Sequence, residues 1–271
     1  MRALVLAGGG AKGAYQAGAL LHMMDICGRQ YDLISGTSVG AINAAYLAHW
    51  APKDGKTAAK MLAEIWRTLS SKNIYKRWAW FGKLAVIWKG SLYDSRPLHR
   101  FLEENLNAEA IEDSGMKLRV TATDMEAGVS RVYDEGHPLI VKAVQASSAV
   151  PGVFLPVQVG GAWHTDGGVL DMAPLKPAID AGATEIDVIL LEPEAPSEQE
   201  KSEYSAFDVA TRSIDLMMKE ITRGDLFTHK QAQIMVVRPN TSLTSDSLDF
   251  DQPNVRKMMR RGLLDARRVF A

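Results

Sequence analysis

The sequence contains a single cysteine, Cys27, among its 271 residues. An internal disulfide bond is therefore excluded, and so is a metal site built from several thiolates. The chain also lacks an excess of basic residues, since its formal net charge is −1. Domains that bind nucleic acid are usually strongly basic, and we therefore expect no nucleic acid partner.

Long apolar runs are absent as well. No stretch reaches the ~18 consecutive apolar residues that indicate a membrane-spanning helix. The N-terminal sequence MRALVLAGGGAKG has a short apolar run that ends at three glycines, which is typical of a buried strand rather than of a signal peptide. We therefore expect a cytosolic or peripheral-membrane protein. The hydrophobic content of 46% and the charged content of 23% are ordinary for a globular chain.

Apolar runs that alternate with helical patterns indicate the fold class. Strands are predicted at Arg2–Ala7, Tyr31–Ser35, Met116–Thr123, Ile186–Leu191 and Ile234–Val237. Helices are predicted at Ala14–Ile26, at Val39–His49 and over residues 95–106, 138–147, 173–182, 205–225 and 254–270. This alternation predicts an α/β fold with a mostly parallel central sheet and helices on both faces. The Glu-, Pro- and Ser-rich stretch Glu192–Glu203 is too short for a domain linker, so we expect one domain over residues 1–271.

A G-x-S-x-G motif occupies residues 36–40 as Gly36-Thr37-Ser38-Val39-Gly40. In this motif the serine sits on a sharp turn between a strand and a helix, where a side chain in place of either glycine would collide with neighbouring backbone. The turn places the serine at a helix N-terminus, whose free N–H groups favour negative charge. A serine N-cap between two chance glycines is the alternative. The apolar strand before the motif and the Ala-rich helix after it favour Ser38 as a nucleophile.

A glycine-rich loop, Gly8-Gly9-Gly10-Ala11-Lys12-Gly13, follows the first predicted strand. The backbone N–H groups of such a loop suit either a dinucleotide pyrophosphate or the oxyanion of a tetrahedral acyl intermediate. A dinucleotide site needs an acidic residue at the end of the second strand. This chain has Ser35-Gly36-Thr37-Ser38 at that place, and we therefore favour an oxyanion hole.

A serine nucleophile needs a base. None of the six histidines lies in a recognisable catalytic context; they are His22, His49, His99, His137, His164 and His229. Asp166 is followed by Gly167 and Gly168, which exposes its carboxylate on a tight turn but is also the sequence of an ordinary β-turn. A conventional Ser–Asp–His triad would use His229, which follows Asp166 in chain order. The spacing alone leaves the base open.

The three motifs together resemble the patatin-like phospholipase family, which shows a G-G-G-x-[RK]-G loop, a G-x-S-x-G elbow and a D-G-[AG] triplet in this order. A fourth block of that family, Ala-Ser followed by Pro, matches residues 146–151, and the resemblance covers about residues 3–192. It implies a Ser–Asp dyad without histidine, in which Ser38 attacks and Asp166 accepts its proton. It also implies that N–H groups of Gly8, Gly9 and Gly10 hold the oxyanion. Further motif positions are Lys12, Gly13, Gly36, Gly40, Gly167 and Gly168.

The resemblance implies a serine-dependent hydrolase of fatty acyl esters, such as phospholipids, lysophospholipids or simpler esters, that works through an acyl-enzyme. It implies neither a metal nor an organic cofactor. Two alternatives stay open at this point. One is an acyl transferase, which we would expect to need a histidine. The other is a catalytically silent membrane-binding protein.

The stretch from Ile65 to Tyr93 contains no Asp or Glu. It contains six basic residues and four tryptophans: Arg67, Lys72, Lys76, Arg77, Lys83, Lys89, Trp66, Trp78, Trp80 and Trp88. Such a mixture suits an anionic membrane interface, which predicts peripheral membrane contact through residues 66–89. A lid or core helix with inward tryptophans is the alternative. The basic segment Val255–Phe270 is expected to be an amphipathic helix packed on the domain, with a second membrane or dimer contact as the alternative.

Overall fold

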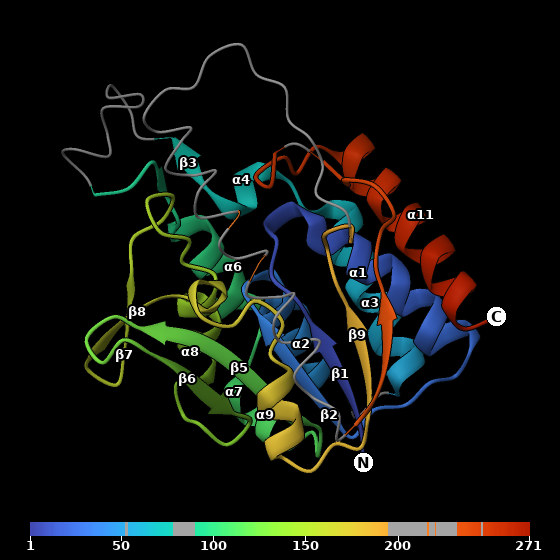
Figure 1. The fold of residues 1–271 in the computed structure, drawn as a ribbon. Coiled ribbons are helices and arrows are strands. Elements are labelled where there is room, and N and C mark those ends of the chain that lie inside the picture. The colour runs from blue at the N-terminus through green and yellow to red at the C-terminus, as the bar shows by residue number, and fades with distance from the viewer. Residues whose placement is uncertain (52–53, 78–89, 195–215, 217–219, 221–231, 245) are drawn as a thin grey trace.

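The computed structural model describes residues 1–51, 54–77, 90–194, 216, 220, 232–244 and 246–271 (Figure 1). In this part of the chain the centre is a mixed sheet with the strand order β10-β9-β1-β2-β5-β8-β7, and β6 also pairs with β5. Its strands are β1 (Arg2–Leu6), β2 (Leu33–Thr37), β5 (Lys117–Asp124), β6 (Val129–Asp134), β7 (Val157–Val159), β8 (Ala162–Asp166), β9 (Glu185–Ile189) and β10 (Gln233–Val237). A separate short ribbon pairs β3 (Lys76–Arg77) with β4 (Tyr93–Asp94).

The parallel half of the sheet consists of β10, β9, β1, β2 and β5. Most residues of β1, β2, β5 and β9 are buried, because both faces of this half are covered. In β1, for example, Leu4 and Leu6 point into one hydrophobic core while Ala3 and Val5 point into the other. All five predicted strands are present with shifted ends. The second begins at Leu33 rather than at Tyr31, because the Asp32 carboxylate accepts the Arg2 backbone N–H at 2.8 Å just before the strand starts.

The antiparallel edge consists of β6, β7 and β8, which the sequence analysis did not predict as strands. β2 and β8 pair with successive parts of one edge of β5, and β6 pairs with the other edge. β7 then pairs with β8. β6 is exposed along nearly its whole length and carries mixed polar and apolar residues, so it lacks the continuous apolar pattern that identifies a buried strand.

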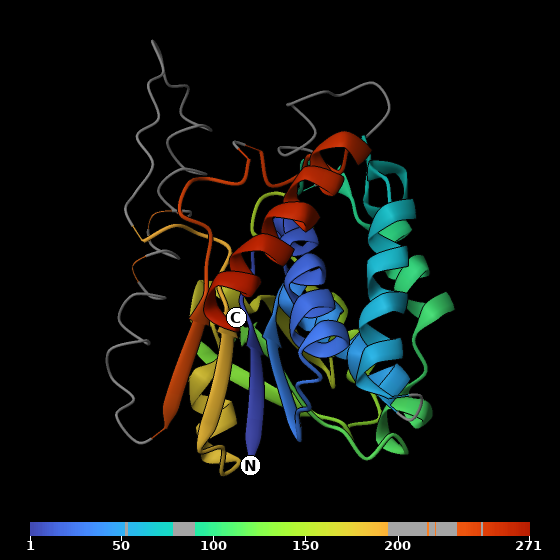
Figure 2. The ribbon, with the colours of Figure 1, turned by 90° about the vertical axis from the view of Figure 1, so that its right-hand side faces the viewer.

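Helices cover both faces of the sheet, as predicted (Figure 2). One face packs against α1 (Gly13–Leu20) with its π-helical continuation (Leu21–Ile26), α2 (Val39–Trp50), α3 (Gly55–Thr68), α6 (Arg96–Asn105), α7 (Ala108–Glu112), α8 (Ile140–Ser147) and α11 (Gln252–Val269). The other face packs against α9 (Leu175–Asp180), whose Leu175 and Ala178 contact the Ala3 and Val5 side of the sheet. α4 (Ser71–Ile74) is a single turn after α3.

Two sequence predictions fall largely or partly outside the described residues. The helix predicted over 205–225 lies there except for residues 216 and 220, and the loop predicted for Glu192–Glu203 is described only up to residue 194. The one-domain organisation expected for residues 1–271 stays a prediction. Among the helices of the described residues, none has both the length and the apolar character needed to cross a bilayer.

Candidate active site

The G-x-S-x-G motif forms the turn between β2, which ends at Thr37, and α2, which begins at Val39. Ser38 between them has φ 56° and ψ −126°, a strained conformation for a residue with a side chain. A Cβ at Gly36 would lie 2.4 Å from the Gly40 carbonyl oxygen, and one at Gly40 would lie 2.0 Å from the Leu6 carbonyl oxygen. Both glycines are therefore required for the turn, which places the Ser38 side chain at the start of α2.

Asp166 meets Ser38 across the sheet. The Ser38 Oγ donates a hydrogen bond to Asp166 Oδ2 at 2.6 Å. Asp166 is the last residue of β8, and its other oxygen, Oδ1, accepts the backbone N–H of Gly168 at 2.8 Å. Gly167 and Gly168 form a short 3-10 turn directly after the carboxylate. One carboxylate oxygen is thus fixed by the turn, while the other faces the serine.

Burial controls the protonation of this carboxylate. Asp166 is 1% exposed, and desolvation raises the pKa of Asp166 to about 6, although the hydrogen bonds from Ser38 and Gly168 favour the ionised form. A carboxylate with a pKa in this range is ionised at neutral pH and is also basic enough to accept a proton. The pair therefore has the geometry and the basicity for transfer of the Ser38 proton.

Ser147 is a site residue to which the sequence analysis assigned no role. It is the last residue of α8, it is fully buried, and its Oγ accepts the backbone N–H of Ser38 at 2.8 Å. The carbonyl oxygen of Ala149 accepts the backbone N–H of Asp166 at 3.0 Å. The Ala-Ser…Pro block at residues 146–151 thus contacts the backbone of both Ser38 and Asp166. Recognition of the block was the only signal in the sequence for this arrangement.

The glycine-rich loop passes beside Ser38. A Cβ at Gly8 would lie 3.0 Å from the Ser38 Cβ, so a larger residue would crowd the nucleophile. The N–H of Gly8 donates to the Met172 carbonyl oxygen at 3.0 Å and is therefore already occupied. In the described part of the chain no acceptor takes the N–H groups of Gly9 and Gly10. Of the three glycines expected to donate to an oxyanion, Gly9 and Gly10 therefore stay candidates, whereas Gly8 does not.

Residues far along the chain hold this loop in place. Gly10 has φ 60°, and its Cβ would lie 2.3 Å from the Ser247 carbonyl oxygen. The same carbonyl accepts the N–H of Ala11 at 2.7 Å. Lys12 is 7% exposed and forms an ion pair with Glu192, just beyond β9. The next motif position, Gly13, is the first residue of α1. The basic position of the motif therefore ties the loop to the end of the sheet.

The described histidines do not reach the pair. His164 is buried, with its Nδ1 3.0 Å from the Ala162 carbonyl oxygen and its Nε2 2.7 Å from the Tyr133 hydroxyl. Because a carbonyl only accepts, Nδ1 donates to Ala162, and both ring nitrogens are engaged by groups other than Ser38 and Asp166. Within the residues that the structure describes, no histidine hydrogen-bonds to Ser38 or Asp166. His229 lies outside the described residues.

The basic and aromatic segment is only partly described. Trp66 is 2% exposed in α3, donates its Nε1 proton to Asn43 Oδ1 at 2.9 Å, and stacks on Phe250 with ring centres 6.3 Å apart. Trp66 therefore packs inward, as in the alternative of a core helix, and membrane contact through the rest of the 66–89 segment stays a prediction. Lys76 and Arg77 are exposed on β3. Residues 78–89, with the other three tryptophans, lie outside the described residues.

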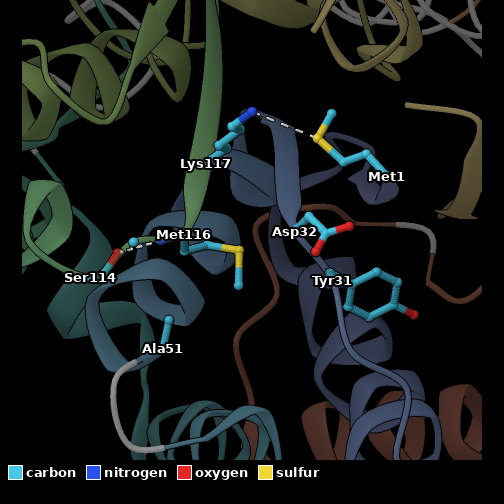
Figure 3. A pocket seen from close by; sticks show the side chains of 8 residues that line it. Met1, Tyr31, Asp32, Ala51, Ser114, Met116 and Lys117 are labelled. Atoms are coloured by element: carbon cyan, nitrogen blue, oxygen red, sulfur yellow. Dashed lines mark hydrogen bonds between the residues drawn. The ribbon is translucent and has the colours of Figure 1, made fainter. Parts of the chain in front are cut away.

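Figure 3 shows a surface hollow that is separate from the Ser38 site. It is lined by Met1, Tyr31, Asp32, Ala51, Ser114, Gly115, Met116 and Lys117. These residues include the positions just before β1, β2 and β5, whereas Ser38 follows the far end of β2. The hollow is thus separate from the Ser38 site. Among the described residues, no group of three or more His, Cys, Asp or Glu side chains is arranged to hold a metal ion.

Comparisons with known proteins identify the family of the chain. The family model "Patatin-like phospholipase" matches residues 4–179, which is more than half of the chain. The chain is 27% identical to the uncharacterized protein YqhO of Bacillus subtilis over 193 residues, covering 63% of this chain and 64% of that one. It is 26% identical to the lysophospholipase NTE1 of Candida glabrata over 178 residues, covering 64% of this chain and 9% of that one.

The fold also resembles a solved structure, VipD from Legionella pneumophila. The TM-score is 0.54 at 14% sequence identity, and the match covers 99% of this chain and 66% of VipD. At this identity the likeness concerns the fold alone. The chain spans less than two thirds of the length of YqhO and of NTE1.

Proposed function

Because the chain belongs to the patatin-like phospholipase family, a family of lipid hydrolases, we propose that it is a serine-dependent lipid acyl hydrolase with a Ser38–Asp166 dyad. The observation that carries this proposal is the 2.6 Å hydrogen bond from Ser38 Oγ to Asp166 Oδ2 at the strained turn before α2. The substrates are acyl esters such as phospholipids, lysophospholipids or simpler esters.

The reaction proceeds through an acyl-enzyme. Ser38 Oγ attacks the carbonyl carbon of the ester while its proton passes to Asp166 Oδ2. The tetrahedral intermediate then collapses, the alcohol leaves with the proton from Asp166, and the acyl group stays on Ser38. A water molecule next gives a proton to Asp166 and attacks the acyl-enzyme. The second tetrahedral intermediate releases the fatty acid, and Asp166 returns the proton to Ser38.

Two features of the site favour stabilisation of the negative charge on the tetrahedral intermediates. The N–H groups of Gly9 and Gly10, which have no acceptor in the described part of the chain, are candidates for the oxyanion hole. The N-terminus of α2 begins directly after Ser38 and adds a favourable dipole. Gly8 contributes room beside the nucleophile rather than a donor.

The location proposed for the protein is the cytosol, with peripheral contact to lipid surfaces. In the described part of the 66–89 segment Trp66 is buried, and the exposed cations are Arg67, which pairs with Glu64, and Lys72, Lys76 and Arg77. Their charge suits contact with an anionic lipid surface.

Labelling with a fluorophosphonate tests the proposed function. This reagent phosphonylates an activated serine, and mass spectrometry of the digested protein locates the adduct. We expect a single adduct on Ser38 and none on a Ser38→Ala variant. Ser148→Ala is a matched control, because Ser148 donates to the Val144 carbonyl oxygen and does not contact Asp166. A folded wild-type protein that stays unlabelled, or that is labelled elsewhere, would overturn the proposal.

A further inference from the structure

The inner face of α11 packs closely against α1 (Figures 1 and 2). A Cβ at Gly18 would lie 1.8 Å from the Met259 carbonyl oxygen, and one at Gly262 would lie 1.9 Å from the Tyr15 carbonyl oxygen. The two helix backbones therefore touch at these glycines. Asp265 adds a buried polar contact, since it accepts a hydrogen bond from Tyr15 at 3.1 Å. α11 is thus a firmly held element, and its outer face is presented in a defined orientation.

The outer face of α11 carries cations in a strip. Arg256, Arg260 and Arg267 are exposed and follow one another by four and by seven residues, which places them on the same side of a helix. Lys257 and Leu264 lie beside this row, again seven residues apart, and Leu264 is 39% exposed. The face therefore combines four positive charges with one exposed apolar side chain.

Acidic partners are missing from this strip. Within the described part of the chain, none of the four cations forms an ion pair. The only acid between Gln252 and Phe270 is Asp265, which is 4% exposed and faces inward. Arg261 and Arg268 already bind it, at 2.9 Å each. The strip is thus a local excess of about four positive charges on a chain whose net charge is −1.

We propose that this outer face of α11, defined by Arg256, Lys257, Arg260, Leu264 and Arg267, docks the protein on an anionic lipid bilayer. Charge complementarity selects the partner, because juxtaposed cations are attracted to anionic headgroups while an exposed leucine can enter the interface. The proposal rests on the proposed function, because an acyl-lipid hydrolase meets its substrate at the surface of a lipid bilayer. A nucleic acid would also attract the cations, but it offers no apolar layer for Leu264.

The start of α11 lies near the proposed catalytic machinery. The loop that leads into the helix contributes the Ser247 carbonyl that accepts the Ala11 N–H beside the glycine-rich loop. Gln252 in the first turn donates to the Trp66 carbonyl oxygen at 3.2 Å. The start of α11 therefore lies close to the end of the sheet where Ser38 lies.

Vesicle co-sedimentation tests the docking surface directly. The protein carries Ser38→Ala, so that lipid is not consumed, and the vesicles contain either phosphatidylcholine alone or phosphatidylcholine with 30% phosphatidylglycerol. The test variant adds Arg256→Gln, Lys257→Gln, Arg260→Gln and Arg267→Gln. The matched control instead adds Arg100→Gln, Lys117→Gln, Lys142→Gln and Lys176→Gln, four exposed cations elsewhere. Among the described residues the first three form no ion pair, and Lys176 pairs only with Asp180 on the same helix. Both variants lose four positive charges.

We expect the parent to bind only the anionic vesicles and to release them at high salt. The α11 variant should bind at least about 100-fold more weakly, since each basic residue near an anionic surface contributes several-fold to affinity. The control should lose less than tenfold. Equal losses in the two variants, or a parent that ignores anionic vesicles at low salt, would overturn the proposal. A third variant carries Lys76→Gln and Arg77→Gln, and it should weaken vesicle binding less than the α11 variant does. A larger loss of binding in this third variant would place the docking surface on β3 and contradict the proposal.

A separate assay distinguishes failure of the docking proposal from failure of the proposed hydrolase function. Turnover of a soluble short-chain ester, measured with Ser38 intact, should be unchanged by the four α11 substitutions. Absence of turnover in the wild-type protein would count against the hydrolase proposal and leave the vesicle result to be judged on its own. Tight binding of a DNA duplex at the same salt, with no binding to vesicles, would identify a different polyanionic partner and overturn the docking proposal.

Discussion

The parallel half of the sheet and its antiparallel edge contribute one residue each to the Ser38–Asp166 pair. Ser38 follows β2, a fully buried strand between β1 and β5. Asp166 ends β8, a short strand that pairs with the last residues of β5. β5 therefore aligns the two halves, since Gly36 is in register with Val120 and Asp166 with Ala122. The buried parallel half thus holds the strained serine, whereas the edge supplies a carboxylate whose position depends on the pairing of β8 with β5.

Substitutions should separate what each half contributes. The nucleophile and the glycine-rich loop belong to the parallel half, whereas ionisation of Asp166 and positioning by Ser147 belong to the edge and to α8.

Removal of the nucleophile should have the largest effect. Ser38→Ala is expected to lower the hydrolysis of a soluble ester to background, a loss on the order of 10⁴-fold or more. The side chain is small and its backbone conformation is imposed by neighbouring glycines, so circular dichroism and the melting temperature should change little. Appreciable activity in the folded variant would show that another group attacks the ester.

The glycine-rich loop should show the next largest effect. Gly10→Ala would push a Cβ against the Ser247 carbonyl and shift the loop, and we expect kcat to fall about 10²-fold, as for loss of an oxyanion donor. Gly28→Ala is the matched control, because Gly28 has a similar φ of 65° but open space around its Cβ position. If both variants keep the same kcat, the oxyanion is held elsewhere.

Low pH should abolish the activity by protonating Asp166, the residue at the antiparallel edge. Because burial raises the pKa of Asp166 to about 6, its carboxylate is protonated below that pH and no longer accepts the Ser38 proton. We expect kcat/KM to level off above about pH 7 and to fall about tenfold per pH unit below about pH 6. A profile that stays flat down to about pH 4.5, with the fold intact, would contradict the burial argument.

Substitution of Ser147 should have the smallest effect on turnover among these positions. Ser147→Ala leaves the buried N–H of Ser38 without its acceptor, and the loss of about 1 kcal/mol corresponds to about fivefold in kcat. KM for a soluble ester should not change, because Ser147 orients the turn and does not bind the substrate. Ser148→Ala in the same helix end is the control, and an equal loss there would indicate a general effect on α8 rather than a positioning role.

The parallel half was predictable from local patterns, and the edge was not. The continuous apolar strands and the glycines of residues 8–13 and 36–40 reflect steric requirements that act over a few residues. Asp166-Gly167-Gly168 also fits an ordinary turn, and only the pairing of β8 with β5 brings the carboxylate to Ser38. Local sequence carries no information about that pairing.

Three further features depend on partners that are distant in sequence. The acceptor role of Ser147 arises from a contact with a residue 109 positions away. The N–H of Gly8 is occupied by a carbonyl from Met172. Trp66 resembled an interfacial tryptophan, but Asn43 and Phe250 hold it in the core. Each of these outcomes was decided by tertiary packing, which composition and spacing do not reveal.

A comparison of Asp166→Asn with His229→Asn and His164→Asn on a soluble ester decides whether Asp166 alone serves as the base for Ser38. His229 is the histidine that a conventional triad would use. We expect Asp166→Asn to lose at least ~100-fold in kcat, the scale of general-base catalysis, while both histidine variants keep most of their turnover. An inactive but folded His229→Asn variant would contradict the role of Asp166 as the only base.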